Sequence, residues 1–218
     1  MSLFRLDASI RVEGSHSREI ADVVEQEWRS AHPNAAVTTR HIGLDPIPAT
    51  AWATAVTAPY TPAEDRTPEQ REAVALAAEA ADQLLDADAL LFAVPLYNYG
   101  VSQHFKTWLD LVVTDPRLGP GTEPALKGKP AVLVTVRGGG YGPGTPREGW
   151  DHATGWMRRF LADVWQLDLK VVESELTLAD VTPAMEPLRG LAKDLRAAAE
   201  KTAREHGKDL AGASLTRV

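Results

Sequence analysis

The sequence predicts an α/β protein with a doubly wound parallel sheet that is covered by helices on both faces. Apolar runs typical of strands alternate with helical stretches along the chain, and this order favours parallel strands between two helical layers. The run Ala-Leu-Leu-Phe-Ala-Val at residues 89–94 is continuous rather than alternating, as expected for a central strand buried on both faces. Polar and glycine-rich loops follow several of the expected strands, and such folds bind ligands at strand ends.

The first half of the chain supplies two strands and three helices. Residues 3–8 form the first expected strand, and the apolar residues of 18–31 recur at helical spacing. Residues 37–42 form the second strand, followed by a proline-rich crossing with a short helix at 51–56. The sequence Thr-Pro-Glu-Gln at 67–70 supplies a cap, a first-turn proline and a first-turn acid for a helix that runs to about residue 87.

The second half continues the alternation. Pro95 is expected to stop the hydrogen-bond ladder of the central strand, because proline has no N–H. The remaining elements are expected in the order helix 103–113, strand 130–136, helix 149–164, strand 167–173 and helix 183–206. Five strands in this alternation favour the flavodoxin-like order 2-1-3-4-5. We expect residues 1–218 to form a single domain, with flexibility only in the tail after about residue 206.

Composition narrows the function. The formal net charge of −7 over 218 residues argues against non-specific nucleic-acid binding, because no basic cluster offsets the acidic excess. The chain has no cysteine, so thiol nucleophiles, disulfides and iron–sulfur clusters are excluded. The six histidines show no zinc-site spacing, and we predict no metal. The sequence shows neither a signal peptide nor a stretch of transmembrane length, so we expect a cytoplasmic protein.

The first candidate binding loop joins the first strand to the first helix. Ser9, Ser15 and Ser17 lie in it, together with His16. Hydroxyls and free N–H groups at a helix N-terminus bind a phosphate dianion without a lysine. The alternative is that Ser15 or Ser17 only caps the helix and that His16 is an exposed loop residue. The chain contains neither G-x-G-x-x-G nor G-x-x-x-x-G-K, so dinucleotide-fold and P-loop assignments are disfavoured.

Two further loops are expected at the same edge of the sheet. After the central strand, Pro95, Leu96, Tyr97, Asn98 and Tyr99 offer aromatic rings and an amide, although these residues also suit packing and a turn. After the fourth strand come the residues Val136, Arg137, Gly138 and Gly139. Glycines let the backbone approach a ring, and their N–H groups stabilise negative charge at a flavin edge. A flexible surface loop is the alternative, but three such loops on one edge favour a flavin.

These loops, in this order, resemble those of the FMN-dependent NADH-azoreductase and quinone reductase family. The helix Gln-His-Phe-Lys-Thr-Trp-Leu-Asp at 103–110 and the sequence Leu-Lys-Gly-Lys-Pro at 126–130 add to the likeness, which covers residues 1 to about 175. The resemblance implies an FMN site in which Ser9 and Ser15 to Ser17 hold the phosphate and ribityl end. It also implies that Leu96 to Tyr99 contact the isoalloxazine and that Val136 to Gly139 border its pyrimidine edge.

The resemblance further implies a homodimer that passes two electrons from NADH or NADPH through FMN to a quinone or an azo compound, by a ping-pong mechanism. FMN performs the redox step, so no dedicated acid or base is expected; Asn98 and Gly139 are expected to orient or stabilise the flavin. Val136 stands where relatives have a serine or threonine, and Asp163 stands at an aromatic position. Trp165 or Tyr141 is expected to supply the missing ring.

Two other functions fit the same fold. The first is an FMN-binding electron carrier of flavodoxin type, which meets protein partners instead of small substrates. The long crossing after the second strand and the loop at 114–125 favour dimer-built pockets over the open flavin edge of such a carrier. The second is a structural or regulatory domain that has lost the cofactor.

Overall fold

A parallel sheet forms the centre of the protein in the computed structural model, which describes residues 1–119, 121 and 123–215. Within these residues five strands run parallel in the order β2-β1-β3-β5-β6. Their bounds are β1 Ser2–Asp7, β2 Ala36–His41, β3 Ala89–Tyr97, β5 Pro130–Val136 and β6 Asp168–Ser174; a short β4, Gly100–Val101, pairs antiparallel with the end of β3. Numbered along the chain, the parallel strands have the predicted flavodoxin-like order 2-1-3-4-5, which is confirmed.

The two central strands are the most apolar. All residues of β5 are buried, and so are the residues of β3 up to Leu96. The two strands pair in register from Leu90 opposite Ala131 to Pro95 opposite Val136. The edge strand β2 is largely exposed. A continuous apolar run therefore marks the strands covered on both faces, as the sequence predicted.

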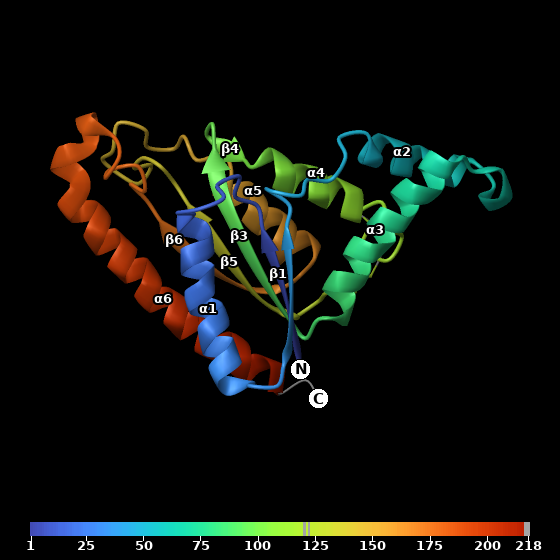
Figure 1. Cartoon of the computed structure of the whole chain (residues 1–218), viewed down its shortest axis with the longest axis horizontal. Helices are drawn as coiled ribbons and strands as arrows, with labels where there is room; N and C mark the ends of the chain where they lie inside the picture. Colours follow the sequence, from blue (N-terminus) through green and yellow to red (C-terminus); the bar gives the residue numbers. More distant parts are fainter. Residues whose placement is uncertain (120, 122, 216–218) are drawn as a thin grey trace.

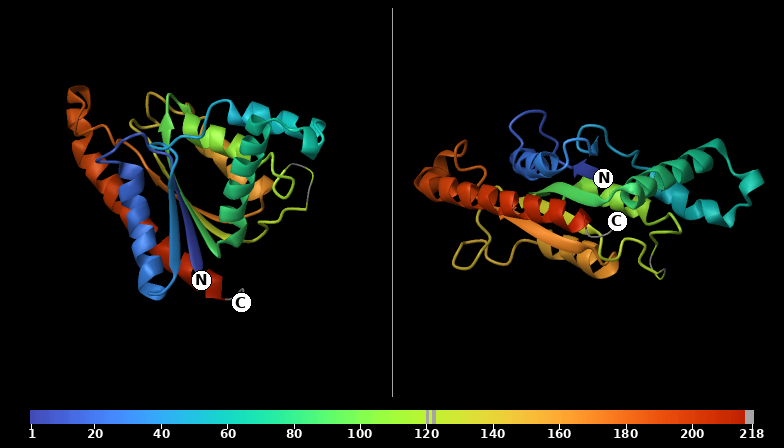
Figure 2. Two further views of the ribbon diagram at one scale, coloured as in Figure 1. Left: turned by 45° about the vertical axis from the view of Figure 1, so that its right-hand side comes forward. Right: turned by 90° about the horizontal axis from the view of Figure 1, so that it is seen from below.

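Helices cover the sheet in two layers (Figures 1 and 2). One layer contains α1, His16–Ala31, and α6, Arg189–Leu215, whose Ile20, Val24, Trp28 and Ala203 are buried in one hydrophobic cluster. The other layer contains α2 Ala51–Thr57, α3 Pro68–Asp86, α4 Gln103–Val112 and α5 Thr154–Arg158. Their apolar side chains, including Phe105 and Trp108, form the second cluster. The proline-rich crossing supplies α2 and the short 3-10 turns Ala58–Tyr60 and Ala63–Asp65.

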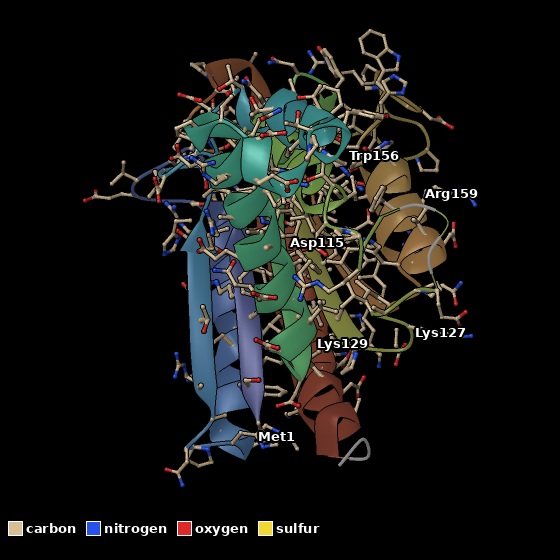
Figure 3. All side chains as sticks on the ribbon, turned by 90° about the vertical axis from the view of Figure 1, so that its right-hand side faces the viewer. Met1, Asp115, Lys127, Lys129, Trp156 and Arg159 are labelled. Carbon is tan, nitrogen blue, oxygen red and sulfur yellow. The ribbon has the colours of Figure 1, made fainter. Side chains whose placement is uncertain are left out.

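Side chains provide hydrogen-bond partners for backbone groups at both ends of α3. Thr67 Oγ1 accepts from Gln70 N at 3.2 Å, and Gln70 Oε1 accepts from Thr67 N at 3.0 Å, so the predicted cap is a reciprocal capping box. At the other end the buried Lys129 donates to the carbonyl oxygens of Leu84, Leu85 and Ala87 at 2.7, 2.7 and 2.5 Å. Figure 3 shows Lys129 beside the lower end of this helix.

The prediction that Pro95 ends the ladder of the central strand is wrong. The strand β3 continues to Tyr97, with Pro95 opposite Val136 and with Leu96 and Tyr97 opposite β4. Its other neighbour, β1, ends at Asp7 opposite Ala93. Pro95 therefore lies beyond the part of β3 that pairs with β1. Because proline has no N–H, a position without a β1 partner is one where the strand tolerates it.

Two helix boundaries also differ from the prediction. The helix expected from residue 149 begins at Thr154 and passes into a π-helix, Arg159–Val164, because Gly149 has a positive φ of 77° and Asp151 Oδ1 accepts from Ala153 N and Thr154 N. The last helix, expected over 183–206, starts with a 3-10 segment, Pro183–Leu188, and continues to Leu215.

The C-terminal extension of α6 is explained by its packing on α1. A Cβ built at Gly207 would lie 2.9 Å from the carbonyl oxygen of Val24, so the glycine allows the two backbones to approach closely. Beyond it Leu210 and Ala211 are buried. The expected helix end at His206 is therefore wrong; residues 216–218 of the tail lie outside the described residues. None of the helices in the described ranges combines the length and the apolar character needed to cross a membrane.

Candidate functional site

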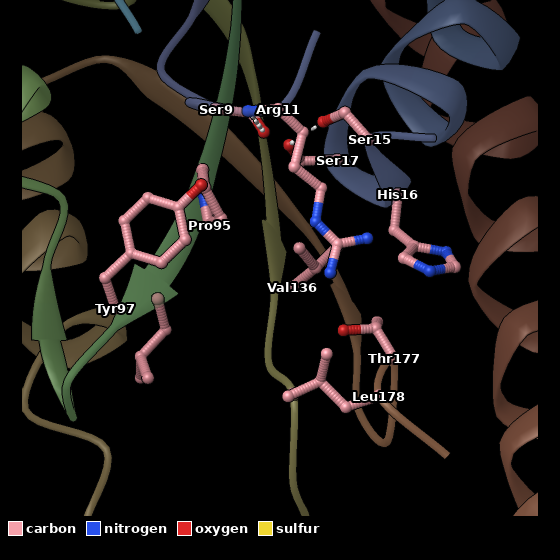
Figure 4. A pocket seen from close by; sticks show the side chains of 12 residues that line it. Ser9, Arg11, Ser15, His16, Ser17, Pro95, Tyr97, Val136, Thr177 and Leu178 are labelled. Carbon is pink, nitrogen blue, oxygen red and sulfur yellow. Dashed lines mark hydrogen bonds between the residues drawn. The ribbon is translucent and has the colours of Figure 1, made fainter. Parts of the chain in front are cut away.

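A cavity opens at the carboxyl edge of the sheet, between the loops that follow β1, β3, β5 and β6 (Figure 4). These loops are neighbours because the sheet order places the ends of their strands side by side. The cavity is lined by Ser9, Arg11, Ser15, His16, Ser17, Pro95, Leu96, Tyr97, Val136, Gly138, Thr177 and Leu178.

Three serine hydroxyls form the end of the cavity beside α1. Ser9, Ser15 and Ser17 are all buried. Ser9 Oγ accepts from Arg11 N at 3.3 Å, Ser15 Oγ accepts from Arg18 N at 3.5 Å, and the hydroxyls of Ser15 and Ser17 lie 3.3 Å apart. Ser15 therefore caps α1, which was the alternative to a binding role. It nevertheless lines the cavity together with Ser9 and Ser17. Since α1 begins at His16, the N-terminus of this helix also lies at the cavity, and a helix N-terminus favours negative charge.

Two arginines, one in the first loop and one in the first turn of α1, add positive charge. Arg18 holds the loop closed by donating to the carbonyl oxygens of Arg11 and Val12, the latter at 2.8 Å. The side chain of Arg11 runs into the cavity between Val136 and His16 (Figure 4), and its Nη1 donates to Gly14 O at 3.2 Å. Within the described part of the chain no carboxylate pairs with Arg11. Its charge is thus available to an anion.

His16 lies at the start of α1, and its Nδ1 is 3.0 Å from Nη1 of Arg196 in α6. Because a guanidinium can only donate, Nδ1 accepts, and the neutral ring carries its proton on Nε2. Burial is the largest cause that lowers the pKa of His16; Glu19 opposes it, and Arg196 and Arg11 add to it. The net pKa lies below the ordinary value, so His16 is neutral at pH 7.

The second wall consists of Pro95, Leu96 and Tyr97 at the end of β3. Tyr97 Oη accepts from Ile10 N at 3.2 Å, which ties this wall to the serine loop. Asn98 and Tyr99 form the two-residue turn to β4, with positive φ angles of 49° and 66°. These angles are those of a type I′ hairpin turn, and a bulky residue such as Tyr99 adopts them only under strain.

The side chain of Tyr99 lies outside the cavity. Its ring centroid is 6.2 Å from that of Tyr141 and 5.4 Å from that of Trp150, both edge to face. The guanidinium carbon of Arg147 lies 5.8 Å from the same ring. The turn therefore connects the cavity wall to an aromatic cluster in the loop before α5.

The third wall is the turn after β5, in which Gly138 is held by the loop after β6. Thr177 N donates to Arg137 O at 3.1 Å, and Leu178 N donates to Gly138 O at 3.2 Å. A Cβ built at Gly138 would lie 2.6 Å from Leu178 Cδ1. No acceptor pairs with the N–H groups of Gly138 and Gly139 among residues 1–119, 121 and 123–215, so both remain free to donate to a ligand.

Arg137 points away from the cavity into a cluster of carboxylates. Its guanidinium lies 2.7 Å from Asp151 and 2.9 Å from Glu175, and it also pairs with Glu173. Burial acts to lower the pKa of Arg137, but the hydrogen bond and charge of Glu173, with the charge of Asp151, outweigh it and raise the pKa. Arg137 thus braces the glycine turn against β6 and the start of α5.

The cavity brings together most of the residues that the sequence singled out. The predicted residues that line it are Ser9, Ser15, His16, Ser17, Pro95, Leu96, Tyr97, Val136 and Gly138; those that do not are Asn98, Tyr99, Arg137 and Gly139. Sequence reasoning missed Arg11, Thr177 and Leu178. Arg11 lies in a loop that was already singled out, and Thr177 and Leu178 follow the last strand, whose end reaches the same edge. In the described part of the chain no group of three or more potential metal-ligating side chains is arranged to hold a metal ion.

A parallel sheet in this order, with a serine-lined cavity at its first loop, is typical of a flavodoxin-like protein, and the family described as having a flavodoxin-like fold matches residues 1–199. Among curated proteins, an FMN-dependent NADH:quinone oxidoreductase from Frankia alni is 40% identical over 205 residues, which cover 93% of this chain and 97% of that protein. A protein of the same name from Streptomyces avermitilis is 34% identical over 211 residues, covering 96% and 97%. The chain therefore belongs to the family of FMN-dependent NADH:quinone oxidoreductases, which confirms the resemblance to this oxidoreductase family.

Solved structures agree on the fold. An azoreductase from Bacillus anthracis superposes with a TM-score of 0.76 at 20% identity, covering 96% of this chain and 99% of that one. An FMN-dependent NADH-azoreductase from the same species, solved in complex with FMN, gives 0.67 at 15% identity and covers 93% and 100%.

Proposed function

We propose that this protein is an FMN-dependent oxidoreductase that transfers two electrons from NADH or NADPH to quinones or aromatic azo compounds by a ping-pong mechanism. The observation that carries the proposal is the cavity itself. Three buried serine hydroxyls and the N-terminus of α1 line one part of it, and Gly138 lines another. The free N–H groups of Gly138 and Gly139 belong to the turn after β5 that borders the cavity. The names of the relatives, FMN-dependent NADH:quinone oxidoreductase, support the same cofactor, donor and acceptor class.

In this proposal the serine loop holds the phosphate of FMN. Ser9, Ser15 and Ser17 donate hydroxyl hydrogen bonds, the first N–H groups of α1 donate alongside them, and His16 borders the ribityl end. Arg11, which was not among the residues predicted from the sequence, adds a positive charge for the phosphate. Hydrogen bonds to an ionised phosphate are stronger than neutral ones, and the helix dipole favours the same charge.

The other two walls hold the ring system. Leu96 and Tyr97 pack against one side, Asn98 and Tyr99 shape the turn that aims this wall, and Gly138 and Gly139 donate to the pyrimidine edge, with Val136 and Arg137 behind them. FMN supplies the redox chemistry when bound, and the protein orients it and sets its electrostatics. Val136 brings no hydroxyl to this edge, so one hydrogen bond, worth about 1 kcal/mol, is absent compared with a serine there.

We also propose that each chain forms a single flavodoxin-like domain and that two copies of the chain form a homodimer. Exposed apolar side chains gather on the crossing that follows β2, where Trp52 is 46%, Val56 41% and Tyr60 86% exposed. Burying them against a second copy would remove apolar surface from water. Sedimentation of the wild type and of Trp52→Glu tests the dimer; a monomeric wild type would rule it out.

The phosphate site is tested by comparing two flavins. Ser17→Ala should weaken FMN binding about tenfold, because hydrogen bonds to charged groups contribute about 1.5–3 kcal/mol. Riboflavin has no phosphate, so its affinity should not change. Ser30, an exposed serine of α1 that donates to Gln26 O, supplies the matched control Ser30→Ala. Equal loss of both flavins in Ser17→Ala would contradict the assignment of this end to phosphate.

The activity is tested with the purified protein and added FMN. The protein should become yellow and oxidise NADH when menadione, benzoquinone or an azo dye is present. A protein that binds FMN but oxidises no NADH with any of these acceptors would instead be an electron carrier of flavodoxin type. A protein that stays colourless after FMN addition would exclude both flavin functions and favour a domain that has lost the cofactor.

A further inference from the structure

The loop before α5, residues 141–152, is an ordered structure that folds back on the glycine turn. Thr145 N donates to Gly142 O at 3.2 Å, Glu148 N to Thr145 O at 3.1 Å, and Trp150 N to Arg147 O at 3.1 Å. Both ends of the loop are anchored to the edge of the site. Tyr141 N donates to Glu175 Oε1 at 3.2 Å, and His152 N donates to Tyr99 O at 3.0 Å.

The fold of this loop places the guanidinium of Arg147 beside the turn after β5. A Cβ built at Gly139 would lie 3.4 Å from Nη1 of Arg147, so the guanidinium packs directly against Gly139. Its other side is held by Tyr99, whose ring centroid is 5.8 Å from the guanidinium carbon. A planar guanidinium stacks on an aromatic face better than an ammonium does, which fixes the charge at this place.

The carboxylates nearest to Arg147 along the loop and at the end of β6 make their contacts with other groups. Glu148 accepts from Gly144 N at 2.8 Å, while Asp151 and Glu175 are engaged by Arg137. In the ranges that the structure describes, no carboxylate lies within ion-pair distance of Arg147. Gly139 thus has a free N–H group and, on its Cβ side, a guanidinium that makes no ion pair in the described part of the chain.

This arrangement has a chemical consequence if the proposed function holds, since the inference rests on it. In that function the N–H groups of Gly138 and Gly139 would border the pyrimidine edge of FMN, where negative charge develops when a flavin is reduced. A fixed cation beside developing charge stabilises the charged state more than the neutral one. We propose that Arg147 is the residue that stabilises the reduced, anionic form of FMN and so raises its two-electron reduction potential.

The test is the reduction potential of bound FMN in the wild type, Arg147→Gln and Arg147→Lys. Arg147→Gln should weaken binding of reduced relative to oxidised FMN about tenfold, which lowers a two-electron potential by about 30 mV. Its affinity for oxidised FMN should stay close to that of the wild type. Arg147→Lys keeps the charge but stacks less well on Tyr99, so its potential should lie between the two.

A control and a salt series separate charge from structure. Arg29, an exposed arginine in the last turn of α1, supplies the control Arg29→Gln, whose potential should equal that of the wild type. The difference between the wild type and Arg147→Gln should shrink in about 1 M salt, where the screening length is about 3 Å. A structural effect of the substitution would not respond to salt in this way.

Three outcomes would overturn the inference. One is a fully loaded Arg147→Gln protein with an unchanged potential. Another is an unchanged potential combined with a raised KM for NADH or for an anionic acceptor, which would assign Arg147 to substrate binding. The third is a wild-type protein that takes up no FMN, which would remove the proposed function as well, whereas the first two leave it intact.

Discussion

Gly43 provides the sharpest test of how the first loop of the site is held. It lies just after β2, and a Cβ built there would be 2.1 Å from the carbonyl oxygen and 2.4 Å from the carbonyl carbon of Ser9. Both are backbone atoms, so no side-chain rotation can relieve the contact. In Gly43→Ala the end of β2 and the serine loop must therefore separate by about 1 Å before ordinary contact distances return.

The expected loss follows from overpacking, which destabilises by about 1–3 kcal/mol. A loss of about 2 kcal/mol should lower the Tm of the protein without FMN by about 4–8 °C at this chain length. Since Ser9 is the displaced residue, FMN affinity should fall about tenfold, as for one lost hydrogen bond to a charged group. Thermal unfolding and flavin fluorescence titration measure the two effects.

The matched control is Gly190→Ala in α6, where no atom outside the helix backbone lies within 4 Å of the built Cβ. Alanine is favoured over glycine inside a helix by about 0.5–1 kcal/mol, so this variant should be more stable and should bind FMN normally. If Gly43→Ala matches the wild type in both Tm and FMN affinity, the argument that Gly43 fixes the Ser9 loop is wrong.

Two other substitutions test the frame around the site. Lys129→Met leaves the carbonyl oxygens at the end of α3 without their charged donor and should lower the unfolding free energy by about 2 kcal/mol, as measured in urea; an unchanged midpoint would contradict this role. For Asp151, burial acts to raise the pKa, but hydrogen bonds from Thr154 and Ala153 and the charge of Arg137 outweigh it and lower the pKa. The carboxylate therefore contributes stability above the ordinary aspartate pKa of about 3.9, and this contribution is lost as the pH falls through the lower folded value. Asp151→Asn should thus be less stable than the wild type at pH 7, with a gap that narrows below about pH 4; a gap independent of pH would refute the assignment.

The sequence was sufficient for the fold because its strongest signals are local. The continuous apolar run of β3 and the cap at Thr67 each depend on neighbouring residues, and both are present in the structure. The boundaries that failed depend on distant partners. The start of α5 is set by Asp151, which pairs with Arg137, and the extension of α6 is set by its contact with α1 at Gly207.

The site was predicted to the level of loops but not to the direction of every side chain. Arg137 was expected to face the flavin because it lies between Val136 and Gly138. It turns instead toward carboxylates that come from β6 and from the loop before α5, and only the folded sheet brings these together. Arg11 was missed for the opposite reason, because hydroxyls and a helix N-terminus already explain an anion site without a cation.

The walls of the cavity are joined to one another, and this separates two kinds of residue. Ile10 N binds Tyr97 Oη, and Thr177 N binds the carbonyl of Arg137, so the loops after β1, β3, β5 and β6 form one frame. The guanidinium of Arg11 donates to Gly14 O, and that of Arg147 contacts the ring of Tyr99, but neither joins two of these loops by an ion pair in the described chain. Substitutions in the frame should therefore change the stability of the empty protein and the flavin affinity together. Substitutions of the two arginines should cost at most about 1 kcal/mol of stability and act mainly on flavin affinity or potential. Unfolding measurements on the protein without FMN therefore distinguish the two kinds of residue.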